Sequence, residues 1–132
     1  MLTRSTIAIV NPDNTVRSIY CHWDGYPENN GRILNEHYTS PEKINELMDI
    51  GCISSLAPEV HPSPESEHSY ESRQEGVVVA YGRDRGDEGT EAQSFVSEAE
   101  YRIDNDNQEY NYLYKDGVWR VARDEPVDTG NM

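Results

Sequence analysis

The sequence predicts an α+β fold, with a mostly antiparallel sheet of about six strands in three hairpins and two to three helices packed on one face. Two observations lead to this prediction. Runs of β-branched or aromatic residues flank turn-forming residues at three places, and segments with helix-capping residues lie between these hairpins. With 132 residues and nine tyrosines, the chain is long enough to bury a modest core.

The first hairpin is predicted near the N-terminus. Residues 6–10 (TIAIV) are mainly β-branched, turn formers follow, and residues 16–23 alternate in polarity. The alternation places Cys21 on an apolar face, so we expect a buried, inert thiol rather than a nucleophile paired with His22. Cys21 and Cys52 are expected to be reduced. Residues 6–10 could also form an exposed edge strand that pairs two subunits in a homodimer.

Three helices are predicted. Residues 29–38 carry asparagine caps and an apolar stripe. The second helix has Ser40 at its N-cap and Pro41 at its first position, where a missing N–H costs nothing. The third is short, over residues 98–103, because Ser97 begins a capping box.

The middle of the chain combines a polar segment with a second predicted hairpin. Residues 58–75 contain three prolines and five glutamates but little apolar content, which predicts a mobile acidic loop. Residues 77–81 (VVVAY) indicate a strand, and residues 91–96 are predicted to return beside it. The charged, glycine-bearing residues 83–89 would form the solvated tip between them.

A third hairpin is predicted near the C-terminus. Alternating tyrosines from Tyr110 to Tyr114 precede Asp116 and Gly117, a type I′ turn signal. The hairpin would close a single domain over residues 1–123, and the polar residues 124–132 would fray. The tyrosine stripe resembles a base-stacking platform, but single-strand binders pair such platforms with a basic groove that this acidic chain lacks.

Acidic residues dominate the charge of the chain. The net charge is −14, and residues 59–109 contribute −10 of it, with fourteen acids and four bases. A field of one sign repels nucleic acid and membranes, so we expect a basic protein partner, with no direct nucleic-acid or membrane binding. The partner-binding candidates are the acids after the polar segment: Asp84, Asp87, Glu88, Glu91, Glu98, Glu100, Asp104 and Asp106.

A small-ligand pocket is the alternative site. Its candidate residues are His22, Trp23, Asp24, Tyr26 and His37, with Arg83 and Arg85 to grip a nucleotide phosphate. The two arginines are more readily explained as neutralising nearby acids at the solvated tip. We expect no catalytic residue, metal site or cofactor, because the histidines lack ligand spacing and the glycine-bearing turn lacks the P-loop lysine.

Six segments form a specific set. They are residues 19–27 (IYCHWDGYP), 30–31 (NG), 37–38 (HY), 53–56 (ISSL), 79–86 (VAYGRDRG) and 112–119 (YLYKDGVW). Together they resemble a family of small tailed-bacteriophage proteins known as uncharacterised reading frames. The resemblance spans most of the chain and is weakest over residues 58–75. It implies a phage origin and the cytoplasm of the infected host cell, and it transfers no catalytic residue.

One function is expected from these observations, with two alternatives. The leading hypothesis is a non-enzymatic acidic phage accessory protein that binds a basic surface of a host protein. Such a protein could act as an inhibitor or nucleic-acid mimic against host defence or transcription. The alternatives are a small-ligand or nucleotide-binding protein, or modest hydrolase, with the pocket named above, and a structural virion component.

Overall fold

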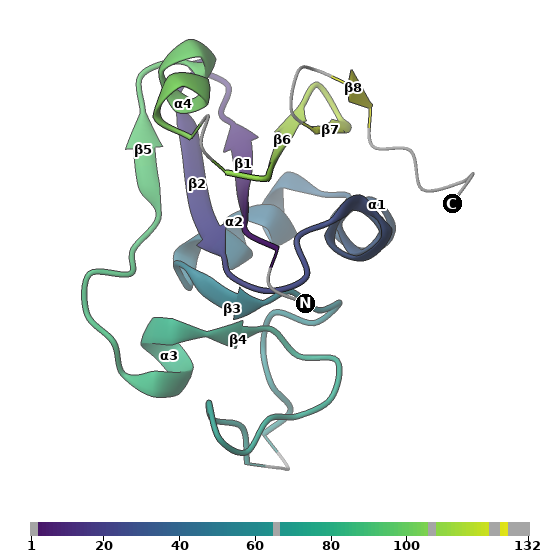
Figure 1. The fold of residues 1–132 in the computed structure, drawn as a ribbon, viewed down its shortest axis with the longest axis vertical. Coiled ribbons are helices and arrows are strands. Elements are labelled where there is room, and N and C mark those ends of the chain that lie inside the picture. The colour runs from purple at the N-terminus through teal and green to yellow at the C-terminus, as the bar shows by residue number, and fades with distance from the viewer. Residues whose placement is uncertain (1–2, 65–66, 106–107, 122–124, 127–132) are drawn as a thin grey trace.

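The computed structural model describes residues 3–64, 67–105, 108–121 and 125–126, the last pair by backbone only. It shows an α+β fold with a mixed, mostly antiparallel sheet (Figure 1). The elements are β1 (Ser5–Val10), β2 (Val16–Cys21), the π-helical turn η1 (Pro27–Gly31), α1 (Arg32–His37), α2 (Pro41–Asp49), β3 (Ile53–Ser55), β4 (Val79–Ala80), α3 (Tyr81–Arg85), β5 (Gln93–Phe95), α4 (Glu98–Asp104), β6 (Tyr110–Lys115), β7 (Val118–Val121) and β8 (Glu125–Pro126). The strand order is β4-β3-β2-β1-β6-β7-β8, with β5 paired to β2. The predicted α+β class is confirmed, and the sheet contains two parallel pairs, β1–β6 and β2–β3.

Strand β1 lies inside the sheet. It pairs antiparallel with β2, which confirms the first hairpin, and parallel with β6 on its other side. Ile7, Ala8 and Ile9 are buried in succession because both faces of this strand are covered. The interpretation of residues 6–10 as an exposed edge strand is therefore wrong, since both edges of β1 are already hydrogen-bonded, while a homodimer stays a prediction.

Helices cover both faces of the sheet rather than one. Leu34 of α1 and Leu47 of α2 pack with Ile7 in the larger core cluster. On the opposite face, Tyr101 of α4 packs against Ala8 in a smaller cluster. The prediction of helices on one face is corrected, because successive residues of β1 point to opposite faces and both sets are apolar.

The predicted helix caps are present. The Ser40 hydroxyl accepts the backbone N–H of Lys43 at 3.3 Å, and the Ser97 hydroxyl accepts that of Glu100 at 3.2 Å. α2 and α4 therefore begin at the residues that the capping pattern indicates. The first predicted helix is divided into the turn η1 and the α-helix α1.

The second predicted hairpin is wrong. The strand expected over residues 77–81 shortens to β4, which pairs with β3 and leads directly into α3, where the solvated tip was predicted. The returning strand β5 pairs instead with β2, and Figure 1 shows it at the outer edge of the sheet with α3 between it and β4. Val77 and Val78 are buried outside the regular strand. The apolar run at residues 77–80 therefore indicates burial correctly, although only part of it forms a strand.

The C-terminal hairpin is confirmed. β6 and β7 pair antiparallel across Asp116 and Gly117, whose φ angles of 54° and 78° suit a type I′ turn. The indole N–H of Trp119 donates to the carbonyl oxygen of Tyr38 at 2.8 Å, which ties the hairpin to α1. In the predicted tail, the backbone of β8 pairs with β7, while residues 124 and 127–132 lie outside the described residues.

Candidate binding surfaces

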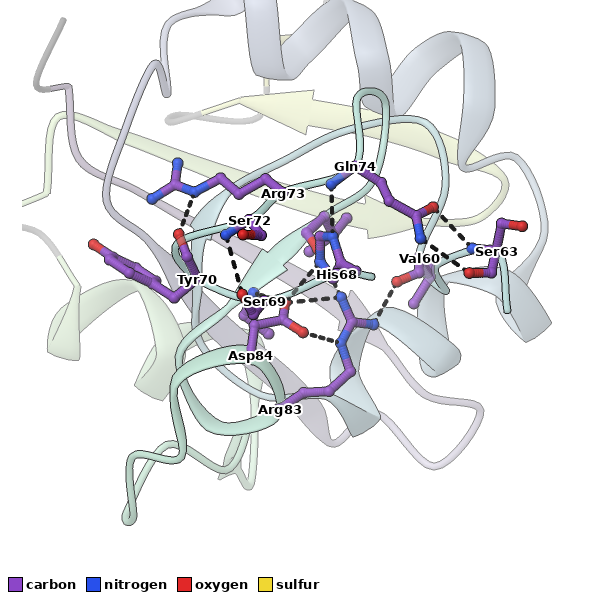
Figure 2. A network of polar contacts seen from close by, with 12 residues as sticks. Val60, Ser63, His68, Ser69, Tyr70, Ser72, Arg73, Gln74, Arg83 and Asp84 are labelled. Carbon is purple, nitrogen blue, oxygen red and sulfur yellow. Dashed lines mark hydrogen bonds and ion pairs between the residues drawn. The ribbon is translucent and has the colours of Figure 1, made fainter. Parts of the chain in front are cut away.

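A buried polar network joins the segment of residues 58–75 to α3 (Figure 2). At its centre the Asp84 carboxylate accepts hydrogen bonds from the Arg83 guanidinium at 2.9 and 3.0 Å and from the backbone N–H of Ala80 at 2.8 Å. It also lies 3.1 Å from Nε2 of His68. The His68 and Asp84 side chains are 1% and 3% exposed. The His68 imidazole, held by an Asp84 that Arg83 neutralises, therefore attaches this segment to α3.

Arg83 and Gln74 extend the network along the segment. Arg83 donates to the carbonyl oxygens of Val60 and Val78 at 2.5 and 2.6 Å. The Gln74 side chain and the Ser63 backbone exchange two hydrogen bonds of 2.9 and 3.0 Å. The described residues of the predicted mobile loop are thus held by specific contacts, and its mobility stays a prediction.

The contacts of His68 define its tautomer. Its Nδ1 accepts the backbone N–H of Gln74 at 3.0 Å, so Nδ1 carries no proton and Nε2–H donates toward Asp84. Burial raises the pKa of Asp84, but the hydrogen bonds and charge of Arg83 and the Ala80 N–H outweigh it, and the pKa lies below its ordinary value of 3.8. Because both ring nitrogens form hydrogen bonds in a buried site, the His68 side chain holds this segment against α3.

The predicted solvated tip at residues 83–89 needs correction only at Asp84: Arg85, Gly86, Glu88 and Gly89 are exposed, and the two arginines pair with Asp84 and Asp87 as expected. Asp84 is buried and fully engaged, so it does not belong to an exposed set of partner-binding acids. Sequence reasoning missed the network because His68 lies 16 residues before Asp84, in a stretch without apolar periodicity. The opposite charges of Arg83 and Asp84 are evident from the sequence, but no local sequence pattern indicates that the Asp84 side chain is buried.

Beside the network lie Tyr70, Tyr81, Arg73 and Arg85, which we call the arginine–tyrosine surface. The two tyrosine rings stack with their centroids 6.2 Å apart. The guanidinium carbon of Arg85 lies 4.7 Å from the Tyr70 centroid and 4.6 Å from the Tyr81 centroid, and that of Arg73 lies 4.7 Å from the Tyr70 centroid. Cation–π contacts of this kind orient both guanidinium groups against the rings.

Backbone contacts from α3 place this surface. The Tyr70 N–H donates to the backbone oxygen of Asp84 at 2.9 Å, and Arg73 Nε donates to the Tyr70 carbonyl oxygen at 2.8 Å, as Figure 2 shows. Arg85 forms an ion pair with Asp87 at 2.5 Å. A cavity of about 430 Å³ opens here, lined by Ser69, Tyr70, Glu71, Asp84 and Arg85.

Aromatic residues at the end of β2 lie next to Tyr81. The backbone N–H of Tyr20 points to Cys52 Sγ at 3.5 Å, and that of Tyr81 donates to the Cys52 carbonyl oxygen at 3.2 Å. The Tyr20 hydroxyl bonds His22 Nδ1 at 2.8 Å, and the His22 ring meets Trp23 edge-on at 5.0 Å. Of the predicted pocket residues, His22 and Trp23 therefore follow β2, and Arg85 lies on α3, whose Tyr81 is connected to β2 through Cys52.

The remaining predicted pocket residues lie elsewhere, in a turn, at the end of α1 and in the polar network. Asp24 and Tyr26 flank Gly25, whose N–H donates to the Thr3 carbonyl oxygen at 2.9 Å and whose own carbonyl accepts the Tyr112 hydroxyl at 2.7 Å. They shape the turn into η1. His37 is exposed at the end of α1 beside Glu36, and Arg83 belongs to the buried network.

The other predicted acids divide into paired and unpaired groups. Asp87 pairs with Arg85, and Glu98 pairs with Arg102 and Lys115. Asp106 lies outside the described residues. In the part of the chain that the structure describes, four of the predicted acids form no ion pair: Glu88, Glu91, Glu100 and Asp104.

These four acids accompany two exposed apolar side chains around β5 and α4. Glu88 and Glu91 precede β5, while Glu100 and Asp104 lie on α4. Val96 and Ile103 are 74% and 72% exposed. Asp104 and Gln93 of β5 line one cavity of about 270 Å³, so α4 and β5 adjoin. We call this the β5–α4 surface: Glu88, Glu91, Val96, Glu100, Ile103 and Asp104.

Neither cysteine is bonded to the other. Cys21 is completely buried, and burial raises the pKa of its thiol to about 11, despite hydrogen bonding with the Asn30 side chain and the Trp23 backbone that lowers it. This confirms that the thiol is buried, and its inertness stays a prediction. Trp23 departs from the predicted apolar face, because it follows the end of β2 and is 37% exposed.

Within the described ranges, no three His, Cys, Asp or Glu side chains converge as a metal site would require, and no helix is both long and apolar enough to cross a membrane. Comparisons with protein-family models, with curated proteins and with solved structures found no match.

Proposed function

We propose that this chain is a non-enzymatic acidic phage accessory protein that binds a basic surface of a host protein through the β5–α4 surface. The observation that carries the proposal is the group of four carboxylates without an ion pair among the described residues, fixed on and just before ordered elements. The cytoplasm of the infected cell is the corresponding compartment. The phage origin rests on the sequence resemblance given above.

The surface combines two features of protein-binding sites. Exposed Val96 and Ile103 provide apolar area that a partner would remove from water, and the unpaired acids on α4 and before β5 provide charge. Charge of one sign steers the encounter with an oppositely charged partner and sets the salt dependence of its rate. The paired acids Asp87 and Glu98 contribute less, because their own bases already neutralise them.

A strand edge adds a third feature. Among the described strands, β5 pairs only with β2, and its Gln93 and Ser94 side chains are exposed. Figure 1 shows this strand at the outer side of the sheet. Carboxylates beside such an edge imitate the regular negative charge of a nucleic-acid backbone. A host protein of defence or transcription that binds nucleic acid through lysines and arginines is the class of partner that this charge suits.

A capture experiment with charge-neutralised variants tests the proposal. The tagged protein would be incubated with host lysate at low and high salt, beside a variant that neutralises the surface: Glu88→Gln, Glu91→Gln, Glu100→Gln and Asp104→Asn. A matched variant removes four exposed acids elsewhere: Glu28→Gln, Glu42→Gln, Glu59→Gln and Glu75→Gln. We expect a basic host protein that is captured at low salt by the wild type and the matched variant but not by the surface variant.

The same experiment can overturn the proposal. Equal loss in both variants would show that total charge, rather than the β5–α4 surface, determines binding. Capture that persists at high salt and in the surface variant would contradict an electrostatic interface. For a purified partner, the association rate should fall at least about tenfold in the surface variant at low salt.

A further inference from the structure

We propose that Arg73 and Arg85 form a phosphate-binding site on the arginine–tyrosine surface, suited to the phosphate group of a nucleotide. This site is separate from the β5–α4 surface and does not depend on the proposed function. Tyr70 and Arg85 line the cavity of about 430 Å³, and Arg73 lies over the Tyr70 ring. Cavities of roughly 300–1,000 Å³ are those in which small ligands bind.

Both guanidinium groups are held in place without exhausting their donors. Arg73 uses Nε for the Tyr70 carbonyl oxygen, and Arg85 uses Nε and Nη2 for Asp87. Among the contacts of the described residues, both Nη nitrogens of Arg73 and Nη1 of Arg85 have no hydrogen-bond acceptor. An oxyanion between these two side chains would accept the charge-assisted hydrogen bonds that these nitrogens can still donate.

The tyrosines make the site rigid and aromatic. Arg85 contacts the rings of both Tyr70 and Tyr81, and Arg73 contacts Tyr70. Both tyrosines are half-buried. Rings already ordered by stacking cost little entropy when a ligand binds, and they offer area to a base or sugar attached to the phosphate.

The local charge permits an anion in spite of the acidic chain. Arg83 and Asp84 neutralise each other beneath the site, so the nearby charges are those of Arg73 and Arg85 against Asp87 and Glu71. At physiological ionic strength, charges beyond about 8 Å are largely screened, so the excess acid elsewhere has little effect. The two acids beside the site imply a weak, salt-sensitive affinity, and Glu71→Gln should strengthen it.

Nuclear magnetic resonance can test the site directly. The Nε–Hε signals of Arg73 and Arg85 would be followed during separate titrations with inorganic phosphate, ribose 5-phosphate, adenosine monophosphate and adenosine at constant ionic strength. We expect saturable shifts of both signals with the three phosphate-bearing ligands and none with adenosine. Tighter binding of the nucleotide than of ribose 5-phosphate would show that the tyrosine rings contact the base.

Matched variants separate this site from general charge effects. Arg73→Gln should weaken nucleotide binding about tenfold, the effect of losing a charge-assisted hydrogen bond. Arg32→Gln removes an exposed arginine on α1 and should leave the affinity unchanged. Because Arg73 is exposed, its variant should keep the backbone spectrum of the wild type. Absence of saturable shifts, shifts that Arg32→Gln reduces equally, or adenosine binding as strong as that of the nucleotide would overturn the proposal.

Discussion

The sheet with α1 and α2 is held together by buried apolar side chains, whereas the segment of residues 58–75 is attached to α3 largely through the His68 imidazole and backbone hydrogen-bonding groups. Leu34, Leu47 and Ile7 are completely buried in one continuous cluster. In the segment of residues 58–75, Val60 joins this cluster, but the buried contacts with α3 are polar ones among His68, Arg83 and Asp84. The first region should therefore respond to loss of volume, and the second to loss of hydrogen bonds or charge.

The largest effect is expected in the apolar region. Leu47→Ala removes a side chain with no exposed surface and should lower the free energy of unfolding by about 2–5 kcal/mol. Chemical denaturation followed by circular dichroism would measure this loss. Val118→Ala, at a side chain that is 42% exposed on β7, is the control and should change stability by less than about 0.5 kcal/mol. A similar loss in both variants would contradict the assignment of Leu47 to the core.

A smaller, local effect is expected in the polar region. Asp84→Asn keeps the size of the side chain, but it removes the charge and directs an amide N–H₂ toward donors from Arg83 and Ala80. The network should weaken by about 1–3 kcal/mol. Hydrogen exchange should accelerate in residues 67–75 and α3 and stay unchanged in β1 and β6.

The control for this local effect is Asp87→Asn. The Asp87 carboxylate forms an exposed ion pair with Arg85. Its removal should leave the hydrogen-exchange rates of α3 nearly unchanged. If Asp84→Asn accelerated exchange equally in β1, the network would be part of the global core rather than a separate attachment.

The difference between the two regions also explains what the sequence could predict. The hairpin of β1 and β2, the hairpin of β6 and β7 and the capped helices α2 and α4 were predictable, because apolar period and turn residues are local signals. The burial of Asp84 was not, because its partner His68 is distant in sequence and polar. The pairing of β5 was missed for a related reason, since β5 has three residues and its partner β2 lies far earlier in the chain.

The candidate surfaces also combine features that local sequence signals predict with features that depend on distant contacts. Glu88, Glu91, Glu100 and Asp104 were found from charge alone, but only the structure distinguishes them from the paired acids Asp87 and Glu98. Tyr70 and Arg73 were not singled out, because they lie in a segment that its composition assigns to a mobile loop. Their role depends on the contact between the Tyr70 backbone N–H and Asp84, which no local pattern indicates.

The smallest expected effect is the pH dependence of the polar region. The pKa of Asp84 is lowered in the folded state, so its ionised form stabilises the fold above the ordinary value of 3.8. As the pH falls below 3.8 and through the folded pKa, the carboxylate is protonated and this stabilisation is lost. The stability difference between the wild type and Asp84→Asn should therefore be constant above about pH 5 and narrow in stronger acid.

Comparing the two proteins at each pH removes the contribution of the other acids, because Asp13, Asp87 and Glu98 titrate in both. Urea unfolding midpoints between neutral pH and strong acid would provide the measurement. A difference that stays constant into acid would show that Asp84 stabilises the network by shape and neutral hydrogen bonds rather than by its charge. In that case a protonated Asp84 would hold residues 58–75 as well as the carboxylate does, and the faster hydrogen exchange of Asp84→Asn in α3 would have to come from the geometry of its amide rather than from the loss of charge.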